Sequence, residues 1–301
     1  LHEQYRFDLF HHLTYANDWM ASFIGALVPI PFVRGPGGGA QRTPKTFLKL
    51  YSFKGRVWES LRSGGQWFFR HDPFFILGQS KAKVILACNG EVLDALPPAV
   101  RSKAQLYSVC GVDPNDFLQY PVKRDHSIFR VVSAGKLIEL KGLTMAIKSF
   151  SVFHSQHPDS SLTIIGDGPE LNKLINEVSK CGAEKYIHFE RWMPHKELIK
   201  EMGRSDVFLF QSFRHGGGTV VVEAMSMGTP VVCLDMCGPS LHVTSETGIK
   251  IIAETPEDAI VKFKEAMEKL YLDRELLKKM GSAGRERAIS VYDWSKIGER
   301  L

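Results

Sequence analysis

The second half of this sequence alternates short runs of β-branched and aromatic residues with helical patterns, and this alternation limits the fold more than any other feature. Strands are expected at residues 129–133, 161–165, 187–189, 207–210, 230–234 and 249–252. Between them apolar residues recur at helical spacing, as Leu143, Ile147 and Phe150 do. Strands that alternate with helices build βαβ units, so the pattern predicts an α/β domain with a parallel sheet.

The residues before 130 are less regular but favour the same class. We expect strands at residues 8–12, 31–34, 84–87 and 105–109, a helix at 19–26 and a glycine-rich loop at 35–39. Turn residues place a linker near 119–127, which predicts two domains, residues 1–122 and 123–301. The chain opens without a start methionine and runs directly into a strand, so we expect that the N-terminal domain lacks its beginning.

The positive charge of the chain is concentrated in one segment. The net charge is +5, and residues 41–71 carry seven basic residues against Glu59, so that segment holds +6 and the rest −1. Seven aromatic residues are interleaved with these charges. Such a segment can lie on an anionic membrane surface, or it can be a solvated, partly packed helical hairpin. A nucleic-acid role has no supporting motif.

Composition excludes several other classes. Apolar residues make up 44% and charged residues 24%, a balance typical of a globular protein. The five cysteines are scattered and odd in number, which favours a reducing compartment and argues against a disulfide framework or a zinc site. The longest apolar stretch, residues 23–33, is interrupted by Pro29 and Pro31 and is too short to span a bilayer.

The first candidate site follows the strand at 129–133. Ser133-Ala134-Gly135-Lys136 ends this strand, and Lys141-Gly142 begins the next helix. In open α/β sheets ligands bind at the carboxyl ends of strands, and helix N-termini attract anions. Lys136 and Lys141 can therefore converge on a diphosphate, although two lysines near a turn can also be solvated surface charges.

A second candidate is the turn Gly166-Asp167-Gly168-Pro169, where glycines allow the backbone to approach a ligand. By itself the turn can equally be a tight connection between a strand and a helix, with Pro169 in the first helical position.

The third candidate is the most informative. Ser212-Phe213-Arg214-His215-Gly216-Gly217-Gly218-Thr219 leads into a helix, and a glycine run that opens a helix offers free N–H groups to an anion. Glu223 follows on an otherwise apolar helix, where an unpaired buried carboxylate would be costly. Glu223 therefore needs partners, and sugar hydroxyls would serve, unless the side chain faces solvent.

The order of these motifs resembles glycosyltransferase family 4, the large retaining GT-B family of group 1 glycosyl transferases. Ser133 to Leu137 looks like its G-R-L strand end, Lys141-Gly142 like its K-G, and Gly166 to Pro169 like its G-D-G-P turn. The block from Glu223 to Val232 is similar to its E-A-M-x-x-G-x-P-V-V motif. The resemblance implies a GT-B fold, with two Rossmann-like domains whose parallel sheets face a cleft.

The resemblance also implies roles for single residues. Lys136, Lys141, His215 and Glu223 would be catalytic, the lysines holding the donor diphosphate and Glu223 the ribose. The implied donor-binding residues are Gly135, Gly166, Asp167, Gly168, Trp192, Met193, Gly216, Gly217, Gly218 and Thr219. His11, His12, Gly37, Gly38 and Gly39 would line the acceptor side, unless the two histidines only cap a strand.

Two departures from the family pattern bear on the donor. Lys136 stands where the family often has arginine, and lysine lacks the bidentate fork. His215 stands eight residues before Glu223, where the family has its first glutamate, so the identity of the transferred sugar is open.

The function implied is transfer of a sugar, with retention, from a UDP-, GDP- or ADP-sugar to a carbohydrate or lipid-linked acceptor in bacterial cell-surface polysaccharide or glycolipid synthesis. No Asp-x-Asp pair is placed to hold a metal, so we expect no metal and no cofactor. We expect a cytoplasmic location, with contact at the inner face of the plasma membrane. The alternatives are a sugar-nucleotide epimerase and a non-catalytic nucleotide-sugar-binding protein, while a Rossmann oxidoreductase lacks its G-x-G-x-x-G motif.

Overall fold

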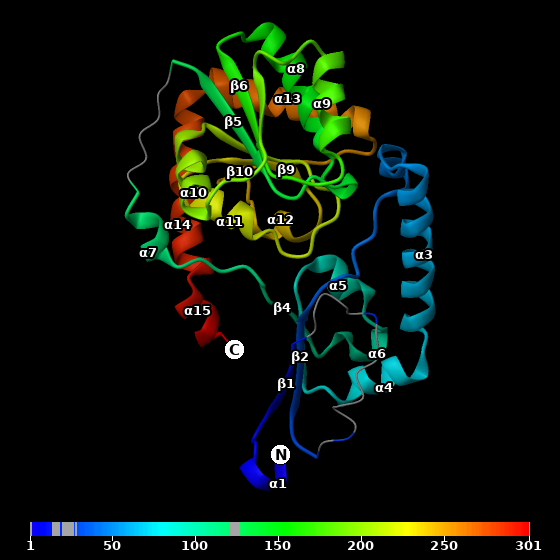
Figure 1. The fold of residues 1–301 in the computed structure, drawn as a ribbon. Coiled ribbons are helices and arrows are strands. Elements are labelled where there is room, and N and C mark those ends of the chain that lie inside the picture. The colour runs from blue at the N-terminus through cyan, green and yellow to red at the C-terminus, as the bar shows by residue number, and fades with distance from the viewer. Residues whose placement is uncertain (1, 14–18, 20–26, 28, 121–126, 301) are drawn as a thin grey trace. The chain divides into compact units, whose positions relative to one another are not determined.

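A computed structural model describes residues 2–13, 19, 27, 29–120 and 127–300 of the chain (Figure 1). It divides into two compact units, each with its own parallel sheet. Unit 1 holds residues 1–42, 53–109 and 215–217, and unit 2 holds residues 43–52, 110–214 and 218–301. Within the described residues no helix has both the length and the apolar character needed to cross a bilayer.

Unit 2 is built on a six-stranded sheet in the order β10-β9-β8-β5-β6-β7, and every neighbouring pair is parallel. This confirms the parallel α/β prediction. The strands are β5 (Phe129–Ala134), β6 (Ser160–Ile165), β7 (Ile187–Glu190), β8 (Val207–Phe210), β9 (Val231–Leu234) and β10 (Gly248–Ile251).

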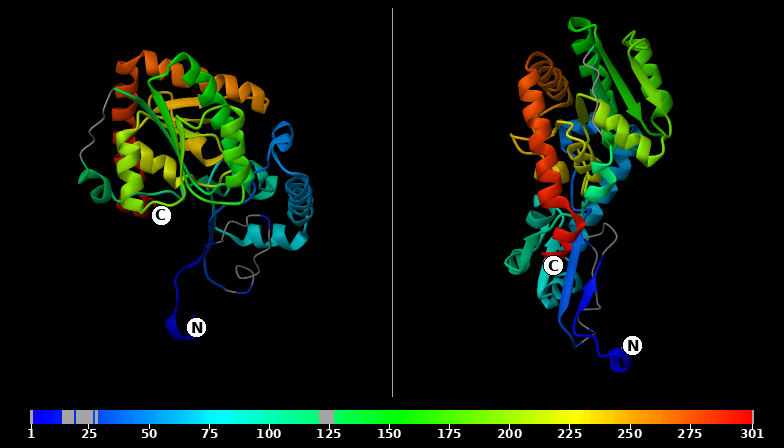
Figure 2. Two further views of the ribbon diagram at one scale, coloured as in Figure 1. Left: turned by 45° about the horizontal axis from the view of Figure 1, so that its top comes forward. Right: turned by 90° about the vertical axis from the view of Figure 1, so that its left-hand side faces the viewer.

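Helices cover both faces of this sheet, as the chain can be followed from green to red in Figures 1 and 2. One face packs on α8 (Leu143–Gln156), α9 (Leu171–Lys180) and α13 (Pro256–Leu272). The other packs on α10 (His195–Arg204), α11 (Thr219–Ser226) and α14 (Arg274–Tyr292). The remaining elements of unit 2 are η1 (Lys45–Leu50), α7 (Pro114–Leu118), η2 (Glu139–Lys141), α12 (Cys237–His242) and α15 (Trp294–Glu299).

The burial pattern explains why the strands and helices of unit 2 could be predicted from the sequence. Every residue of β8 and β9 is buried, as expected for central strands with helices on both faces. The predicted stripe of Leu143, Ile147 and Phe150 is buried on α8. One predicted boundary is wrong, because α9 begins at Leu171 and Pro169 lies in the turn before it.

Unit 1 contains a four-stranded parallel sheet in the order β1-β2-β3-β4. The strands are β1 (Phe10–His12), β2 (Phe32–Gly37), β3 (Val84–Ala87) and β4 (Ala104–Leu106), and the helices are α1 (His2–Tyr5), α3 (Phe53–Arg70), α4 (Pro73–Lys81), α5 (Gly90–Ala95) and α6 (Pro98–Arg101). β2 extends beyond the predicted end at Arg34 into the glycine-rich segment, with a register shift between Arg34 and Gly37. Most of the helix expected at 19–26 lies outside the described residues.

The units do not divide at residues 122 and 123. The chain passes into unit 2 at Cys110, because Cys110, Val112 and Phe117 pack in the same core as α10, α11 and α14. Residues 43–52 also belong to unit 2, where Phe47 and Tyr51 pack on Phe213 with ring centroids 5.4 and 5.8 Å away. Residues 215–217 belong to unit 1. The strand and helix patterns do not predict these exchanges.

Candidate active site

In the sheet of unit 2 the order in which the chain adds strands reverses between β5 and β8, although all strands are parallel. From β5 the chain builds β6 and β7 on one side, and from β8 it builds β9 and β10 on the other. In doubly wound sheets a ligand binds beyond the carboxyl ends of the strands at such a switch point, because the loops diverge there and leave a crevice. The predicted lysines follow the end of β5, one of these two strands.

A small, open hollow lies at this switch point. Its lining comes from residues 133–137 at the end of β5 and beyond it, from Lys141, Leu143 and Ile164, and from residues 210–212 at the end of β8 and beyond it. Ser133 and Gln211 contact across the two strand ends, with 3.4 Å between Oγ and Oε1. Ser212 Oγ donates to the carbonyl of Leu140 at 3.1 Å, which ties the end of β8 to the turn that carries Lys141.

Lys141 is the most unusual group in the hollow. Its Nζ lies 5.1 Å from the centre of the Phe210 ring, and its chain end passes over Gly135. Among the described residues no hydrogen bond or ion pair is seen for this ammonium. Burial lowers the pKa of Lys141 to about 8, because removal from water disfavours the charged form. Lys136 is exposed at the same rim. The hollow therefore joins a poorly solvated positive charge to an exposed one.

Anion binding in this hollow should depend on pH. The protonated Lys141 binds an anion, and a bound diphosphate would raise its pKa again. The affinity for a nucleoside diphosphate should therefore fall as the pH rises through about 8, where half of the free lysine has lost its proton. Calorimetry at this pH in two buffers of different ionisation enthalpy should show proton uptake on binding. Lys141→Arg should abolish the uptake, and an equal heat in both buffers for the wild type would contradict this expectation.

The Gly166 to Pro169 turn packs directly on the backbone after β5. A Cβ on Gly166 would lie 2.0 Å from the carbonyl oxygen of Gly135, and one on Gly168 would lie 2.4 Å from that of Leu137. The two turns also share hydrogen bonds, from Gly135 N to Ile165 O and from Leu137 N to Asp167 O, both 2.9 Å. These glycines therefore shape the wall of the hollow from behind, as a tight turn, and neither lines it.

Asp167 connects this turn to the end of β7. It accepts hydrogen bonds from Arg191 at 2.7 Å and from the backbone N–H of Gly168 at 2.8 Å. These two interactions lower the pKa of Asp167, with Arg191 the larger cause. Trp192 follows and is 75% exposed, whereas Met193 packs partly against the core. The indole face of Trp192 is free to stack on a planar ring.

Glu223 has a partner that the sequence did not reveal. On α11 its carboxylate Oε1 lies 3.0 Å from Nε2 of His195, the first residue of α10. The Glu223 side chain is only 15% exposed, which agrees with the apolar neighbours that predicted its burial. The pair links α11 to the start of α10. The two residues are 28 positions apart, and no sequence motif contains both of them.

The glycine run is divided between the units. Gly218 caps α11 with φ of +110°, so the helix begins at Thr219, which also donates to the sulfur of Cys110 at 3.5 Å. His215, Gly216 and Gly217 belong to unit 1, where Asn89 Nδ2 donates to the carbonyl of Gly216 at 3.0 Å. The prediction that three consecutive glycines open the helix in the donor domain is therefore right only for Gly218. None of the three lines the hollow among the described residues.

In unit 1 the predicted acceptor-side residues lie together. His11 is hydrogen-bonded through Nε2 to the carbonyl of Gly35 at 2.5 Å. The His12 ring lies beside Phe10 and Phe32, with ring centroids 6.5 and 6.3 Å away. Burial, and then the charge of Arg34, lowers the pKa of His12. The glycine segment adjoins them: Gly37 ends β2, Gly38 lies beside Cys88, and Gly39 leaves the strand with φ of +96°.

The structure thus brings Lys136, Lys141 and Gly135 into one hollow and places Gly166, Asp167 and Gly168 behind it. Sequence reasoning missed Phe210 and Gln211, although Phe210 ends a predicted strand and Gln211 directly follows it. It also missed His195, for which no signal was available.

Comparison with known proteins gives a family. The profile of "Glycosyl transferases group 1" matches residues 121–287. A GDP-mannose-dependent α-(1-6)-phosphatidylinositol monomannoside mannosyltransferase of Mycolicibacterium smegmatis is 31% identical over 207 residues, which are 64% of this chain and 53% of that protein. A D-inositol 3-phosphate glycosyltransferase of Paenarthrobacter aurescens is 27% identical over 73% of this chain and 50% of its own. The chain thus spans about half the length of these relatives.

Solved structures agree in fold. The sucrose-phosphate synthase of Thermosynechococcus elongatus superposes with a TM-score of 0.70 and 19% identity, over 99% of this chain and 73% of that one. Anabaena HepE in complex with UDP gives a TM-score of 0.71 at 15% identity, over 99% and 78%. The family profile, which covers more than half of the sequence, and the two parallel α/β units lead to one conclusion: the chain belongs to the group 1 glycosyl transferases and has the GT-B type of fold.

Proposed function

We propose that this protein transfers a sugar from a nucleotide-diphosphate sugar to an acceptor hydroxyl, with retention at the anomeric carbon. The observation that carries the proposal is the desolvated Lys141 ammonium in a hollow at the β5/β8 switch point of a group 1 glycosyl transferase. A diphosphate would supply an anionic partner for the Lys141 ammonium.

The departing diphosphate is the group that most needs stabilisation in such a transfer. Negative charge grows on it as the sugar becomes oxocarbenium-like, and preorganised positive groups often contribute more to catalysis than any other effect. Lys141 and Lys136 would supply this charge, with Gly135 allowing the phosphate close to the backbone. The acceptor would attack from the same face as the leaving group, assisted by a diphosphate oxygen. The sequence offers no Asp-x-Asp pair for a metal, and we propose that the lysines act in its place.

Glu223 would hold the ribose hydroxyls, with His195 orienting the carboxylate. Glu223→Gln should then reduce nucleoside diphosphate affinity by about tenfold to a hundredfold, the usual range for hydrogen bonds to a charged group. The loss should be small for 2′,3′-dideoxy nucleotides, which lack both hydroxyls. Calorimetry with both ligands makes the comparison, and His195→Gln serves as a variant that keeps the carboxylate. Equal losses for both ligands would show that Glu223 does not read the ribose.

The remaining donor and acceptor roles that we propose rest on the family to which the chain belongs. Trp192 and Met193 would border the base, and Gly216, Gly217, Gly218 and Thr219 would approach the phosphate or sugar. His215 would influence which sugar is accepted, and the unit 1 residues His11, His12, Gly37, Gly38 and Gly39 would serve the acceptor.

The acceptor that we propose is a carbohydrate or a lipid-linked sugar, in bacterial cell-surface polysaccharide or glycolipid synthesis. The Mycolicibacterium relative is named for a phosphatidylinositol mannoside acceptor, and the Anabaena neighbour is described in complex with UDP. We also propose a cytoplasmic protein that touches the inner face of the plasma membrane through part of the basic segment.

The proposed reaction can be tested by incubating the protein with UDP-, GDP- and ADP-sugars in the presence and absence of candidate glycolipid acceptors. Transfer with an unchanged anomeric configuration, determined by proton NMR of the product, would support the proposal. A new sugar isomer formed from donor alone would indicate an epimerase instead. Nucleotide binding without turnover on any acceptor would favour a binding protein.

A further inference from the structure

Helix α3 is amphipathic in the reverse of the usual sense, because its polar face is buried and its apolar face is exposed. Glu59 and Gln66 are 5% and 0% exposed. Phe53, Val57 and Leu61 follow each other at four-residue steps, which places them on one side of the helix. The apolar residues that are between 43% and 78% exposed on α3 are Phe53, Val57, Trp58, Leu61, Trp67 and Phe68.

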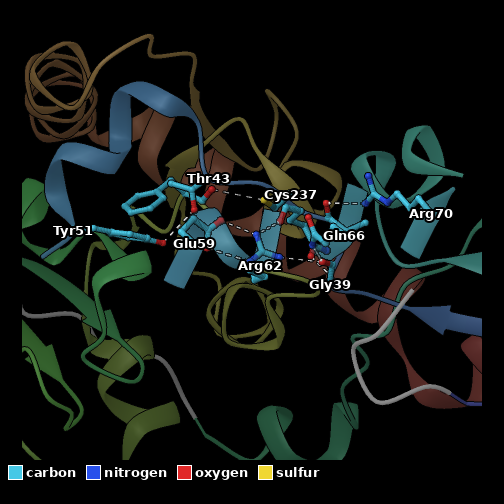
Figure 3. A network of polar contacts seen from close by, with 11 residues as sticks. Gly39, Thr43, Tyr51, Glu59, Arg62, Gln66, Arg70 and Cys237 are labelled. Atoms are coloured by element: carbon cyan, nitrogen blue, oxygen red, sulfur yellow. Dashed lines mark hydrogen bonds and ion pairs between the residues drawn. The ribbon is translucent and has the colours of Figure 1, made fainter. Parts of the chain in front are cut away.

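The buried polar face holds the glycine segment of unit 1, and Figure 3 shows Arg62 and Gln66 directed toward Gly39. Arg62 donates to the carbonyls of Gly39 at 3.2 Å and of Gln41 at 2.6 Å. Gln66 also donates to the Gly39 carbonyl, and Arg70 to that of Ala40 at 3.3 Å. Buried carbonyls need donors, so these contacts fix the rotation of α3 about its axis. The apolar side is consequently turned outward.

The charge around the exposed side is positive. Glu59 is the single acidic residue between 41 and 71, and its carboxylate is buried and bound by Arg62 at 2.7 Å. Lys54 and Arg56 are exposed. At about 100° of rotation per residue, Lys54 lies just beyond Leu61 and Arg56 lies on the other side of Phe53, so the two charges border the Phe53–Val57–Leu61 stripe, and Trp58 and Trp67 lie outside this stripe on opposite sides of the helix. No acidic side chain of this helix offsets them at the surface.

We propose that this surface, the outer α3 face, binds an anionic phospholipid bilayer. We define it as the exposed apolar residues given above together with Lys54 and Arg56. Aromatic and leucine side chains on one side, with basic residues at the flanks, are what an interfacial helix needs to bury its apolar face at the headgroup level. A second copy of the chain fits less well, because both flanks are positive and pairing this face with its copy would bring like charges together.

The structure limits the predicted membrane-binding segment, residues 41–71, to its second part. Residues 43–52 belong to unit 2, where Phe47 and Tyr51 are buried and Lys49 is paired with Glu257, so the first part of the 41–71 segment is already occupied. The part of the segment that can contact a bilayer is therefore the outer α3 face. Its helix also contacts the Gly39 loop, which would bring a lipid-linked acceptor to the acceptor side. This last link rests on the proposed function, whereas the lipid contact does not.

Vesicle sedimentation tests the apolar part of the surface. The wild-type protein should sediment with vesicles of equal parts phosphatidylcholine and phosphatidylglycerol, and little with phosphatidylcholine alone. Trp58→Ser, Leu61→Ser and Phe68→Ser together should reduce the partition coefficient at least about tenfold, because three large apolar groups no longer leave water. The matched control is Ile252→Ser with Leu272→Ser, two residues of unit 2 that are 73% and 70% exposed.

The basic part is tested with Lys54→Gln and Arg56→Gln. Each lost charge should lower partition to the anionic vesicles by about fivefold at low salt, the effect of about one lysine or arginine near such a surface. Lys180→Gln and Lys278→Gln, exposed lysines of unit 2, should change it little. All variants should keep the wild-type affinity for nucleoside diphosphates, measured without vesicles, because that site lies in unit 2.

Three results would overturn the proposal. The wild type would fail to sediment with anionic vesicles at low salt, or the control pair would lose as much binding as the α3 variants. Alternatively, sedimentation velocity without lipid would show a dimer that the α3 variants dissociate, which would assign the face to a second copy. Loss of nucleotide binding in the wild type would instead count against the proposed function and leave the vesicle result intact.

Discussion

Replacement of Lys141 by alanine should lower kcat by about a hundredfold to a thousandfold, the usual effect of removing one preorganised charge-stabilising group. The ammonium is partly desolvated and, among the described residues, is seen to interact only with the Phe210 ring. Burying it without an anion is unfavourable, so the variant should be at least as stable as the wild type. The loss of turnover would therefore come from the site and not from unfolding. Initial-rate kinetics with the best donor and a melting curve measure the two quantities.

Lys148→Ala provides the matched control. Lys148 lies further along the chain on α8, is 46% exposed, and forms an ion pair with Glu177 at 3.2 Å. Exposed pairs of this kind contribute little, so its kcat should stay within about twofold of the wild type. Near-normal turnover in Lys141→Ala would remove the assignment of Lys141 to the leaving diphosphate.

The second large effect is expected from Gly166→Ala. The new Cβ would lie 2.0 Å from the carbonyl oxygen of Gly135, and Gly166 has φ of +143°, a conformation that residues with a side chain rarely adopt. Backbone strain and overpacking together should lower the free energy of unfolding by about 3 kcal/mol or more. The displaced Gly135 should also weaken nucleotide binding in the adjacent hollow. Urea denaturation followed by calorimetry measures both.

Gly182→Ala separates the two causes. Gly182 has φ of +61°, but no atom lies within 4 Å of the point that a Cβ would occupy there, so only the backbone conformation is penalised. Its cost should be about 1 kcal/mol, with nucleotide binding unchanged. If Gly166→Ala and Gly182→Ala were equally stable, the close contact between the two turns would not contribute as described.

The sequence predicted unit 2 well because its central strands are buried on both faces. Continuous apolar runs such as Val207–Phe210 and Val231–Leu234 can be recognised without knowledge of their neighbours, and the residues that follow them mark the carboxyl edge of the sheet. The approach of Lys136 and Lys141 to one hollow followed from the same rule.

The features that sequence could not predict depend on long-range contacts. Phe47 and Tyr51 pack on Phe213, more than 160 residues away, which assigns residues 43–52 to unit 2. The pairing of His195 with Glu223 is of the same kind. The outward apolar face of α3 was hidden because an amphipathic pattern gives two faces and does not say which one is buried. The hydrogen bonds from Arg62 and Gln66 to the carbonyl of Gly39 determine which face of α3 is buried.

The central claim is that the hollow at the β5/β8 switch point holds a nucleoside diphosphate through its two lysines. Isothermal titration calorimetry of UDP, GDP and ADP against the wild type and the variant Lys136→Ala with Lys141→Ala tests it directly. We expect one nucleotide to bind the wild type at a single site and to lose about a hundredfold in affinity in the double variant, roughly 1.5 kcal/mol for each charged contact. Equal affinity in the two proteins, or no binding of any of the three nucleotides to the wild type, would contradict the account.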